Sequence, residues 1–312
     1  MTSTRPARWP VDPQIRRLLE QSAGAPGLHQ IPLADARARV SAIRGLLPPA
    51  PPVHSVRDRV LPRAGGVVPF RTYLPTPSSR RGTILYFHGG GWTLGGIEDS
   101  DGYCRHLAVA SGHRVISVGY RLAPEHPYPA ALDDARAALE WVARECPGDS
   151  IVLGGDSAGG NLATVTTLYA GDQGLPVTGQ VLIYPVVDTD DSRDSFAEFG
   201  GPGLLMTEAD MAWFWDNYAP DPAVRSRAEI SPLHAPDLRR SPSTLLVVAE
   251  HDILRDGALE YAAMLATHGV EVRIKRYPNM IHGFAPLIGL VDDADDALTE
   301  VADYCRDALA RR

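Results

Sequence analysis

The chain has 312 residues, of which 44% are apolar and 22% charged, and its formal net charge is −8. A chain of this length can bury a sizeable core, and its composition excludes an intrinsically disordered protein. The acidic balance, without any basic cluster, argues against nucleic-acid binding. Of the 30 basic residues only Lys275 is a lysine, a bias that suggests a bacterial source.

The sequence predicts neither a membrane anchor nor a disulfide framework. It has no run of about 18 apolar residues, and residues 1–20 carry Arg and Pro without an apolar stretch. We therefore expect no membrane span, no signal peptide and a cytoplasmic location. Cys104, Cys146 and Cys305 are odd in number and too far apart for a metal motif or a disulfide framework.

The first 50 residues contain two short helical patterns. Their apolar positions are Ile15, Leu18 and Leu19 in the first and Leu33, Val40 and Ile43 in the second. The Pro-rich stretch 48–52 separates them from the rest of the chain. Two apolar runs follow, Val56–Leu61 and Val67–Leu74, and their connection through Gly65 and Gly66 predicts an antiparallel hairpin at a sheet edge.

Six short apolar runs come next and alternate with helical patterns. The predicted strands are Thr83–Phe87, Val115–Tyr120, Ile151–Gly154, Gln180–Tyr184, Thr244–Ala249 and Glu271–Tyr277. Their continuous apolar character is typical of strands that are buried on both faces. The alternation predicts an α/β fold with a mostly parallel central sheet and helices on both of its faces.

Four helices are predicted among these strands and after the last of them. Leu132, Ala135, Leu139 and Val142 share one face of the first helix, and residues 158–169 form a buried second helix. Leu259, Ala262, Leu265 and Ala266 line a third, which ends before Gly269. The last runs from Asp293 to Leu309, and Cys305 is expected to pack on its apolar face with Leu298 and Val301.

A serine follows the predicted strand Ile151–Gly154 in the pattern G-x-S-x-G, with Gly155, Ser157 and Gly159 at its fixed positions. A nucleophilic serine on a tight strand-to-helix turn needs these glycines because a Cβ at either position would clash. The helix that follows directs its N-terminal amides toward the serine, where they favour negative charge. This context predicts a nucleophile rather than a Gly-rich turn without chemistry.

Three consecutive glycines, residues 89–91, follow the strand Thr83–Phe87 and His88. Their uncovered backbone N–H groups are suited to stabilise the oxyanion that develops on a carbonyl under attack. The alternatives are a flexible loop or a phosphate-binding loop. A Walker loop would end in Gly-Lys-Ser/Thr, and Lys275 lies elsewhere in the chain. We expect His88 to brace the glycine loop.

Asp252 and His282 follow the last two predicted strands. A serine hydroxyl needs a histidine base, and that base needs a carboxylate to hold its tautomer. The order Ser157, Asp252, His282 along the chain is the order of an α/β-hydrolase triad.

Each of these assignments has alternatives. Glu250 and Asp256 are the alternative acids, and His251 and His88 are the alternative bases. Asp256 begins a predicted helix, where a carboxylate also serves as a cap. The side chain of His251, next to Asp252 at a strand end, is expected to point elsewhere. We favour Asp252 and His282.

Four motifs make the chain resemble the hormone-sensitive lipase family of α/β-hydrolases, also called the bacterial family IV esterases. They are His88-Gly89-Gly90-Gly91-Trp92, Gly155-Asp156-Ser157-Ala158-Gly159-Gly160, the stretch from Tyr120-Arg121-Leu122-Ala123-Pro124-Glu125 to Ala131, and His282-Gly283-Phe284. The resemblance implies an α/β-hydrolase fold and an esterase activity.

Residue by residue, the resemblance implies a nucleophile at Ser157, an acid at Asp252 and a base at His282. It also implies an oxyanion hole made by the backbone amides of Gly90, Gly91 and Ala158, with Gly89 at the bend before them. One departure is local: the family often has Asp-Pro-Leu at the acid, whereas Ile253 and Leu254 follow Asp252 here.

The resemblance further implies a cap, built from residues 1–50 and an insertion at 188–235, over a catalytic core at 51–187 and 236–312. The insertion is too apolar for an ordinary loop. Its large apolar side chains are Leu204, Leu205, Met206, Met211, Trp213, Phe214, Trp215 and Tyr218. We expect some to form the core of the cap and others to line an acyl pocket that keeps water from the intermediate.

Two acidic clusters lie outside this site. Asp188–Asp191 resembles the start of a calcium loop, but Arg193 stands where such a loop requires its sixth-position glycine. Asp292–Asp296 opens the last predicted helix, where negative charge suits the helix dipole. We expect both clusters to be solvated, residues 121–125 to form a buried brace, and no metal site.

The chemistry predicted is that of a serine carboxylesterase, which hydrolyses short- to medium-chain esters through an acyl-enzyme and needs no cofactor. The alternatives are a lactone or amide hydrolase or a natural-product deacetylase on the same triad. A non-catalytic small-molecule-binding relative, such as a hormone receptor, would lack a triad member. We expect a small-molecule ester as partner, no nucleic acid or membrane, and a monomer or a homodimer paired through Glu271–Tyr277.

Overall fold

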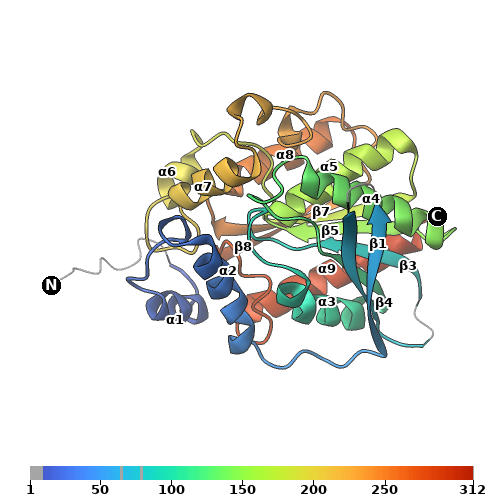
Figure 1. Cartoon of the computed structure of the whole chain (residues 1–312), viewed down its shortest axis with the longest axis horizontal. Coiled ribbons are helices and arrows are strands. Elements are labelled where there is room, and N and C mark those ends of the chain that lie inside the picture. The colour runs from blue at the N-terminus through green and yellow to red at the C-terminus, as the bar shows by residue number, and fades with distance from the viewer. Residues whose placement is uncertain (1–9, 64–65, 78–79, 312) are drawn as a thin grey trace.

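A computed structural model describes residues 10–63, 66–77 and 80–311 of the chain (Figure 1). Its centre is one eight-stranded sheet with the order β1-β2-β4-β3-β5-β6-β7-β8. The strands are β1 (Ser55–Arg63), β2 (Gly66–Leu74), β3 (Arg80–Phe87), β4 (His113–Val118), β5 (Ile151–Asp156), β6 (Val177–Ile183), β7 (Ser243–His251) and β8 (Val272–Ile281). The pairs β1–β2 and β2–β4 are antiparallel, and the pairs from β4 to β8 are parallel.

The six predicted parallel strands and the predicted edge hairpin are confirmed, and with them the mostly parallel α/β fold. The hairpin turn at Gly65 lies outside the described residues. The last strand is longer than expected, because β8 resumes its pairing with β7 at His251 and Ile281 after a register shift. This extension carries the chain to His282 at the end of the sheet.

Helices cover both faces of the sheet (Figure 1). One layer contains α3 (Ile97–Ser111) and α9 (Asp292–Ala310), and the other contains α4 (Ala130–Glu145), α5 (Ala158–Gln173) and α8 (Arg255–Thr267). Successive residues of β3 alternate between the two cores: Leu85 and Phe87 belong to one, and Ile84 and Tyr86 to the other. Burial on both faces explains the continuous apolar runs.

The predicted helices agree with α4, α5, α8 and α9, with two corrections. We did not predict α3, because its apolar face, which includes Tyr103 and Leu107, lies mostly in its second half. Ala266 was expected to line α8 but is exposed, since the buried stripe passes through Ala258, Tyr261 and Leu265 instead. Cys305 is buried in α9 as expected.

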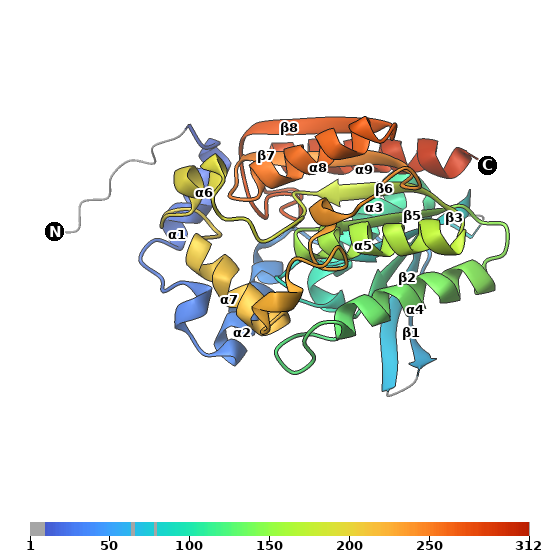
Figure 2. The ribbon, with the colours of Figure 1, turned by 90° about the horizontal axis from the view of Figure 1, so that it is seen from above.

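Two segments gather at one end of the molecule (Figure 2). The N-terminal segment contains α1 (Pro13–Gln21), η1 (Leu28–Gln30), α2 (Leu33–Ala42) and η2 (Ile43–Leu46). The segment between β6 and β7 contains α6 (Asp194–Phe199), α7 (Glu208–Tyr218), η3 (Pro222–Val224) and η4 (Pro232–His234). The two segments are in contact, since His29 Nδ1 lies 2.7 Å from Asp210 Oδ1.

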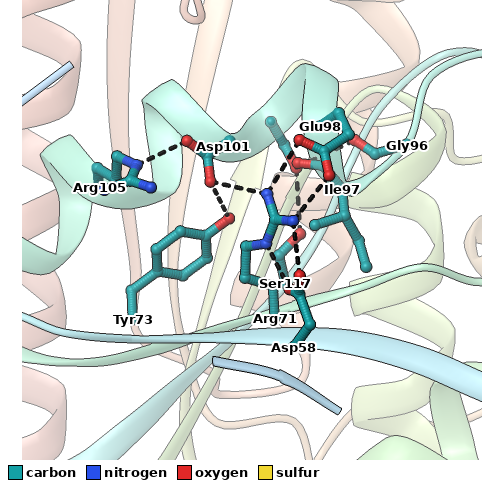
Figure 3. A network of polar contacts seen from close by, with 10 residues as sticks. Asp58, Arg71, Tyr73, Gly96, Ile97, Glu98, Asp101, Arg105 and Ser117 are labelled. Atoms are coloured by element: carbon teal, nitrogen blue, oxygen red, sulfur yellow. Dashed lines mark hydrogen bonds and ion pairs between the residues drawn. The ribbon is translucent and has the colours of Figure 1, made fainter. Parts of the chain in front are cut away.

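Arg71 joins the edge hairpin to α3, the helix that packs against it (Figure 3). Arg71 in β2 pairs with Asp58 in β1 at 2.6 Å, and with Glu98 and Asp101 in α3 at 2.7 and 3.1 Å. These hydrogen bonds raise the pKa of Arg71, and the bond that Arg71 donates to Asp58 has the largest effect. The network thereby holds the first turns of α3, which follow the glycine loop after β3.

The predicted brace at residues 121–125 is only partly buried. Arg121 Nε lies 2.9 Å from the buried carboxylate of Asp134, as a brace requires. Glu125, by contrast, is exposed and pairs with Arg37 of α2 at 2.7 Å. The expectation of burial was wrong because the partner of Glu125 comes from the N-terminal segment at the surface. Within the described residues, no helix is long and apolar enough to cross a bilayer.

Candidate active site

Ser157 sits between β5 and α5 in a strained conformation, with φ +56° and ψ −120°. A Cβ on Gly159 would lie 2.0 Å from the carbonyl oxygen of Phe87, and one on Gly155 would lie 2.3 Å from that of Gly159. The turn is therefore packed backbone against backbone, and only glycine fits at these two positions. Strain of this kind persists where the surrounding structure holds a functional residue in place.

Three side chains from three separate strand ends form one chain of hydrogen bonds. His282 Nε2 lies 2.9 Å from Ser157 Oγ, and His282 Nδ1 lies 2.8 Å from Asp252 Oδ2. The other carboxylate oxygen of Asp252 accepts the N–H of Leu254 at 2.9 Å. Since a carboxylate can only accept, Nδ1 carries the imidazole proton and Nε2 is left to accept the serine hydroxyl. The structure thus brings together the three residues that we favoured.

The alternative acids are engaged elsewhere. Glu250 pairs with Arg276 at 2.7 Å and with Arg255 at 3.3 Å. Asp256 accepts the N–H of Ser195 at 2.8 Å and Arg255 Nε at 2.7 Å. Within the described ranges, the carboxylate hydrogen-bonded to the His282 ring is that of Asp252.

The alternative bases also have other surroundings. His88 stacks on Tyr120 with ring centroids 4.3 Å apart, and its Nδ1 lies 2.8 Å from the carbonyl oxygen of Gly89. His251 packs against Phe199 at 5.5 Å. Burial lowers the pKa of both histidines. The contact with Gly89 agrees with the expected bracing role of His88.

The glycine loop after β3 turns its backbone toward the serine turn. Gly90 and Gly91 have φ values of +108° and +58°, and a Cβ on Gly90 would lie 2.3 Å from the carbonyl oxygen of Leu94. Within the described residues, the N–H groups of Gly90 and Gly91 have no protein acceptor. Ala158 begins α5, so its N–H has no carbonyl one helical turn before it. Free amides of this kind are what an oxyanion needs.

Sequence reasoning missed two aromatic residues near the site. Trp92 and Tyr184 follow β3 and β6, and with Ser157 they are the non-glycine residues of positive φ in the described part of the chain. The Tyr184 ring centre lies 4.7 Å from that of His282, and Trp92 stacks on Tyr218 at 4.2 Å. The available signal was that Tyr184 ends the predicted strand Gln180–Tyr184 and that Trp92 closes the glycine motif after Thr83–Phe87.

The large apolar side chains of the 188–235 insertion divide by burial. Met206, Met211, Phe214, Trp215 and Tyr218 are buried, Leu204 and Trp213 are half-buried, and Leu205 is exposed. Two of them approach the site directly. A Cβ on Gly91 would lie 2.1 Å from the Phe214 ring, and one on Gly283 would lie 3.0 Å from a methyl of Leu205. Phe214 therefore covers the glycine loop, and Leu205 stands beside His282.

The acidic cluster at Asp188–Asp191 corrects one expectation. Asp188 is buried rather than solvated, and both of its oxygens accept from Arg193, at 2.8 and 2.6 Å. Arg193, the residue that excluded a calcium loop, thus supplies the positive charge that balances the Asp188 carboxylate. The other cluster opens α9 as expected. In the described ranges, no three His, Cys, Asp or Glu side chains are grouped to hold a metal ion.

A cavity of about 410 Å³ lies beside His88 and the residues that follow the glycine loop, Gly95 and Gly96. It is lined by His88 and Tyr120 of the core, Arg44 of the N-terminal segment and Asp99 of α3, among others. Neither Ser157, Asp252 nor His282 lines it. This cavity is therefore separate from the three hydrogen-bonded side chains.

Comparisons with known proteins agree with the fold. Residues 84–286 match the model of a family described as having the α/β-hydrolase fold. The carboxylesterase NlhH of Mycobacterium tuberculosis is 36% identical, and the match covers 95% of this chain and 96% of the relative. The solved structure of a hyperthermophilic esterase from Pyrobaculum calidifontis superposes with a TM-score of 0.91 at 37% identity, covering 96% of this chain and 98% of the other.

A gibberellin receptor of Arabidopsis thaliana is also similar to this chain. It is 32% identical, and the match covers 74% of this chain and 66% of the receptor. Similarity in this group therefore extends to a binding protein. In the present chain the His282 ring lies within hydrogen-bonding distance of both Ser157 and Asp252.

Proposed function

The chain belongs to the hormone-sensitive lipase group of the α/β-hydrolase fold family and is a serine carboxylesterase, and we propose that Ser157, His282 and Asp252 carry its reaction. One observation supports this assignment above all. The hydrogen bonds run without a gap from the Asp252 carboxylate through the His282 imidazole to the Ser157 hydroxyl, at 2.8 and 2.9 Å.

In the first half of the reaction, Ser157 Oγ attacks the ester carbonyl while His282 Nε2 takes the hydroxyl proton. The carbonyl oxygen becomes an oxyanion, which the amides of Gly90, Gly91 and Ala158 would bind. His282 then gives its proton to the leaving alcohol, and an acyl group remains on Ser157. Throughout, Asp252 stabilises the imidazolium through Nδ1.

In the second half, a water molecule takes the place of the alcohol. His282 Nε2 accepts a proton from this water, which attacks the acyl carbon and forms a second oxyanion. When the intermediate collapses, the bond to Ser157 Oγ breaks, the proton returns to the serine, and the carboxylic acid leaves.

Labelling with a fluorophosphonate, followed by peptide mapping, tests the nucleophile. We expect one adduct on Ser157, no adduct in Ser157→Ala, and loss of p-nitrophenyl butyrate hydrolysis in the same variant. An adduct at another serine, or undiminished hydrolysis by Ser157→Ala, would reject the assignment.

The cap proposed from residues 1–50 and 188–235 supports a preference for short- to medium-chain acyl groups. The described part of this cap meets the carboxyl end of the sheet through Phe214 on Gly91 and Leu205 on Gly283. Ser157 itself is only 7% exposed. Such a covered site limits the length of the acyl chain and keeps bulk water from the acyl-enzyme.

A substrate panel tests this preference. We expect kcat/KM to be highest for acyl chains of about two to eight carbons and to fall for long chains and for emulsified triglycerides. Comparable turnover of butyrate esters and long-chain triglycerides would reject it. The panel includes lactones, amides and acetylated natural products, because faster turnover of one of these classes would identify the physiological reaction on the same triad.

The location of the protein and its oligomeric state stay predictions. A cytoplasmic location is consistent with the free, unpaired cysteines Cys104, Cys146 and Cys305. A homodimer could form through β8, the strand at one edge of the sheet. Light scattering would distinguish a monomer from a dimer.

A further inference from the structure

Asp156, the residue before Ser157, joins two parts of the site that are distant in sequence. Its Oδ1 accepts the backbone N–H of Gly89 at 3.0 Å and the hydroxyl of Tyr86 at 2.7 Å. Gly89 begins the glycine loop, and Tyr86 lies in β3 among the buried aromatic residues. One carboxyl oxygen thus connects the serine turn with the loop that follows the neighbouring strand.

The place of this contact in the sheet explains its importance. The parallel pairing of β3 with β5 ends at Phe87 and Gly155. Beyond that pair the backbone of β3 continues into the glycine loop, and the backbone of β5 continues into the serine turn. Asp156 is the first residue past the last pair, so its side chain continues a link that the backbone no longer makes.

Glycine loops need such a link because their backbone has unusual freedom. The described bonds of Gly90 and Gly91 lie within the loop. The N–H groups of Thr93 and Leu94 donate to Gly90 O at 3.1 and 2.8 Å, and Thr93 Oγ1 donates to Gly91 O at 2.9 Å. These bonds shape the loop but do not set its distance from the nucleophile. Stabilisation of an oxyanion requires donors placed to within about 0.5 Å.

We propose that Asp156 is a positioning residue, which holds the oxyanion amides of the glycine loop at the correct distance from Ser157. The inference rests on the proposed function, because it assumes that Gly90 and Gly91 bind the oxyanion. Asp156 does not touch the substrate; it acts through Gly89.

The link needs an acceptor and does not need a charge. Loss of solvation on burial raises the pKa of Asp156, although the bond from Tyr86 opposes this effect. The carbonyl oxygen of a neutral carboxyl group or of an amide could accept the Gly89 N–H in the same position. Asp156→Asn should therefore keep the link, whereas Asp156→Leu, of similar shape, removes the acceptor and leaves the Gly89 N–H unpaired.

The test compares an aryl butyrate with its thiono analogue, in which sulfur replaces the carbonyl oxygen. Backbone N–H groups bind a developing O⁻ better than S⁻, so the ratio of the two kcat/KM values measures how well the oxyanion is held. For Asp156→Leu we expect kcat on the oxo ester to fall about 10- to 100-fold, with KM within about threefold. The oxo/thiono ratio should fall at least about fivefold, and Asp156→Asn should stay within about threefold of wild type in both.

A second variant tests the link from the other side, should Asp156→Leu fail to fold. A Cβ on Gly89 would lie 2.2 Å from Asp156 Oδ2, and Gly89 has no positive φ. Gly89→Ala should therefore push the carboxyl away and lower the oxo/thiono ratio in the same way. Gly96→Ala is the matched control, because its Cβ would meet only Asp99 Oδ2 at 3.8 Å.

Three outcomes would overturn the inference: a wild-type ratio in folded Asp156→Leu, a wild-type ratio in Gly89→Ala, or a loss in Asp156→Asn equal to that in Asp156→Leu. The fluorophosphonate adduct separates these outcomes from failure of the proposed function. If Ser157 of the wild type is labelled and the ratio does not respond, only the role of Asp156 is rejected. If Ser157 is not labelled, the proposed mechanism is rejected.

Discussion

Arg37 in α2 donates from Nε to the carbonyl oxygen of Thr93, 3.0 Å away. Thr93 follows the oxyanion glycines, and its hydroxyl in turn donates to Gly91 O. A second guanidinium nitrogen of Arg37 donates to Ala123 O at 3.1 Å. The N-terminal segment therefore binds the end of the glycine loop through Thr93, whereas Asp156 binds its beginning at Gly89.

Replacement of Arg37 by Ala should weaken both the fold and the reaction. Loss of the charged donor leaves the carbonyls of Thr93 and Ala123 with one bond fewer, which should lower the free energy of unfolding by about 1–3 kcal/mol. We expect kcat/KM on p-nitrophenyl butyrate to fall about 3- to 30-fold as the loop loosens. Arg39→Ala, in the same helix, is the control, because Arg39 donates to Pro26 within its own segment. Equal effects of the two variants would contradict the prediction.

The ion pair between Arg37 and Glu125 should make stability depend on pH. The bonds from Arg37 lower the pKa of Glu125 to about 2, from an ordinary value of 4.5. Because the pKa is lower in the folded state, this pair stabilises the protein above pH 4.5 and loses that contribution as the pH falls toward 2. The side chain of Glu125 is 50% exposed, so the contribution is at most about 1 kcal/mol.

Thermal unfolding of wild type and Glu125→Gln checks this dependence. We expect wild type to have the higher Tm at pH 6 and the difference to shrink by pH 3. A difference in Tm that stays constant between these two pH values, or grows toward pH 3, would be inconsistent with a lowered pKa.

The two candidate acids at the end of β7 offer a matched pair of substitutions. Asp252→Asn should lower kcat about 10³- to 10⁴-fold, because an amide at this position favours the wrong tautomer of His282. Glu250→Gln should change kcat less than about threefold, since Glu250 pairs with Arg255 and Arg276. Steady-state kinetics of both purified variants decide the matter. The assignment would be wrong if Glu250→Gln were the more damaging change.

Phe214 should limit the length of the acyl chain that the site accepts. Its ring covers Gly91, and Phe214→Ala would leave a space there at a cost of about 3–5 kcal/mol in stability. We expect the chain-length optimum on p-nitrophenyl esters to move to longer acyl groups. Trp213→Ala, the neighbouring half-buried aromatic residue, should leave the optimum unchanged. The same optimum in wild type and Phe214→Ala would show that the acyl chain lies elsewhere.

Several parts of the site could be predicted because their causes are local. The glycines around Ser157 are required by contacts within a few residues of the turn and by the adjacent end of β3. The inner strands β4, β5, β6 and β7 could be predicted from apolar runs because they are buried. The expected burial was wrong for Glu271–Tyr277, because β8 is an edge strand and most of its residues are not buried. The helix at 97–111 escaped prediction because the apolar residues of its buried face lie mostly in its second half. Ala266 was misplaced because a helix position one residue off the buried stripe turns to solvent.

Patterns in the amino-acid sequence were enough to predict a mostly parallel α/β fold, the nucleophile turn and the order of the candidate triad, because each depends on short motifs with local steric or hydrogen-bonding requirements. The α/β-hydrolase fold followed from the family resemblance. Three contacts became visible in the folded chain alone: His282 pairs with Asp252 and not with Glu250, Asp156 binds Gly89, and Arg37 binds Thr93. These contacts depend on the direction of side chains at strand ends and on how segments far apart in the chain pack. Neither can be derived from residue spacing in a single sequence.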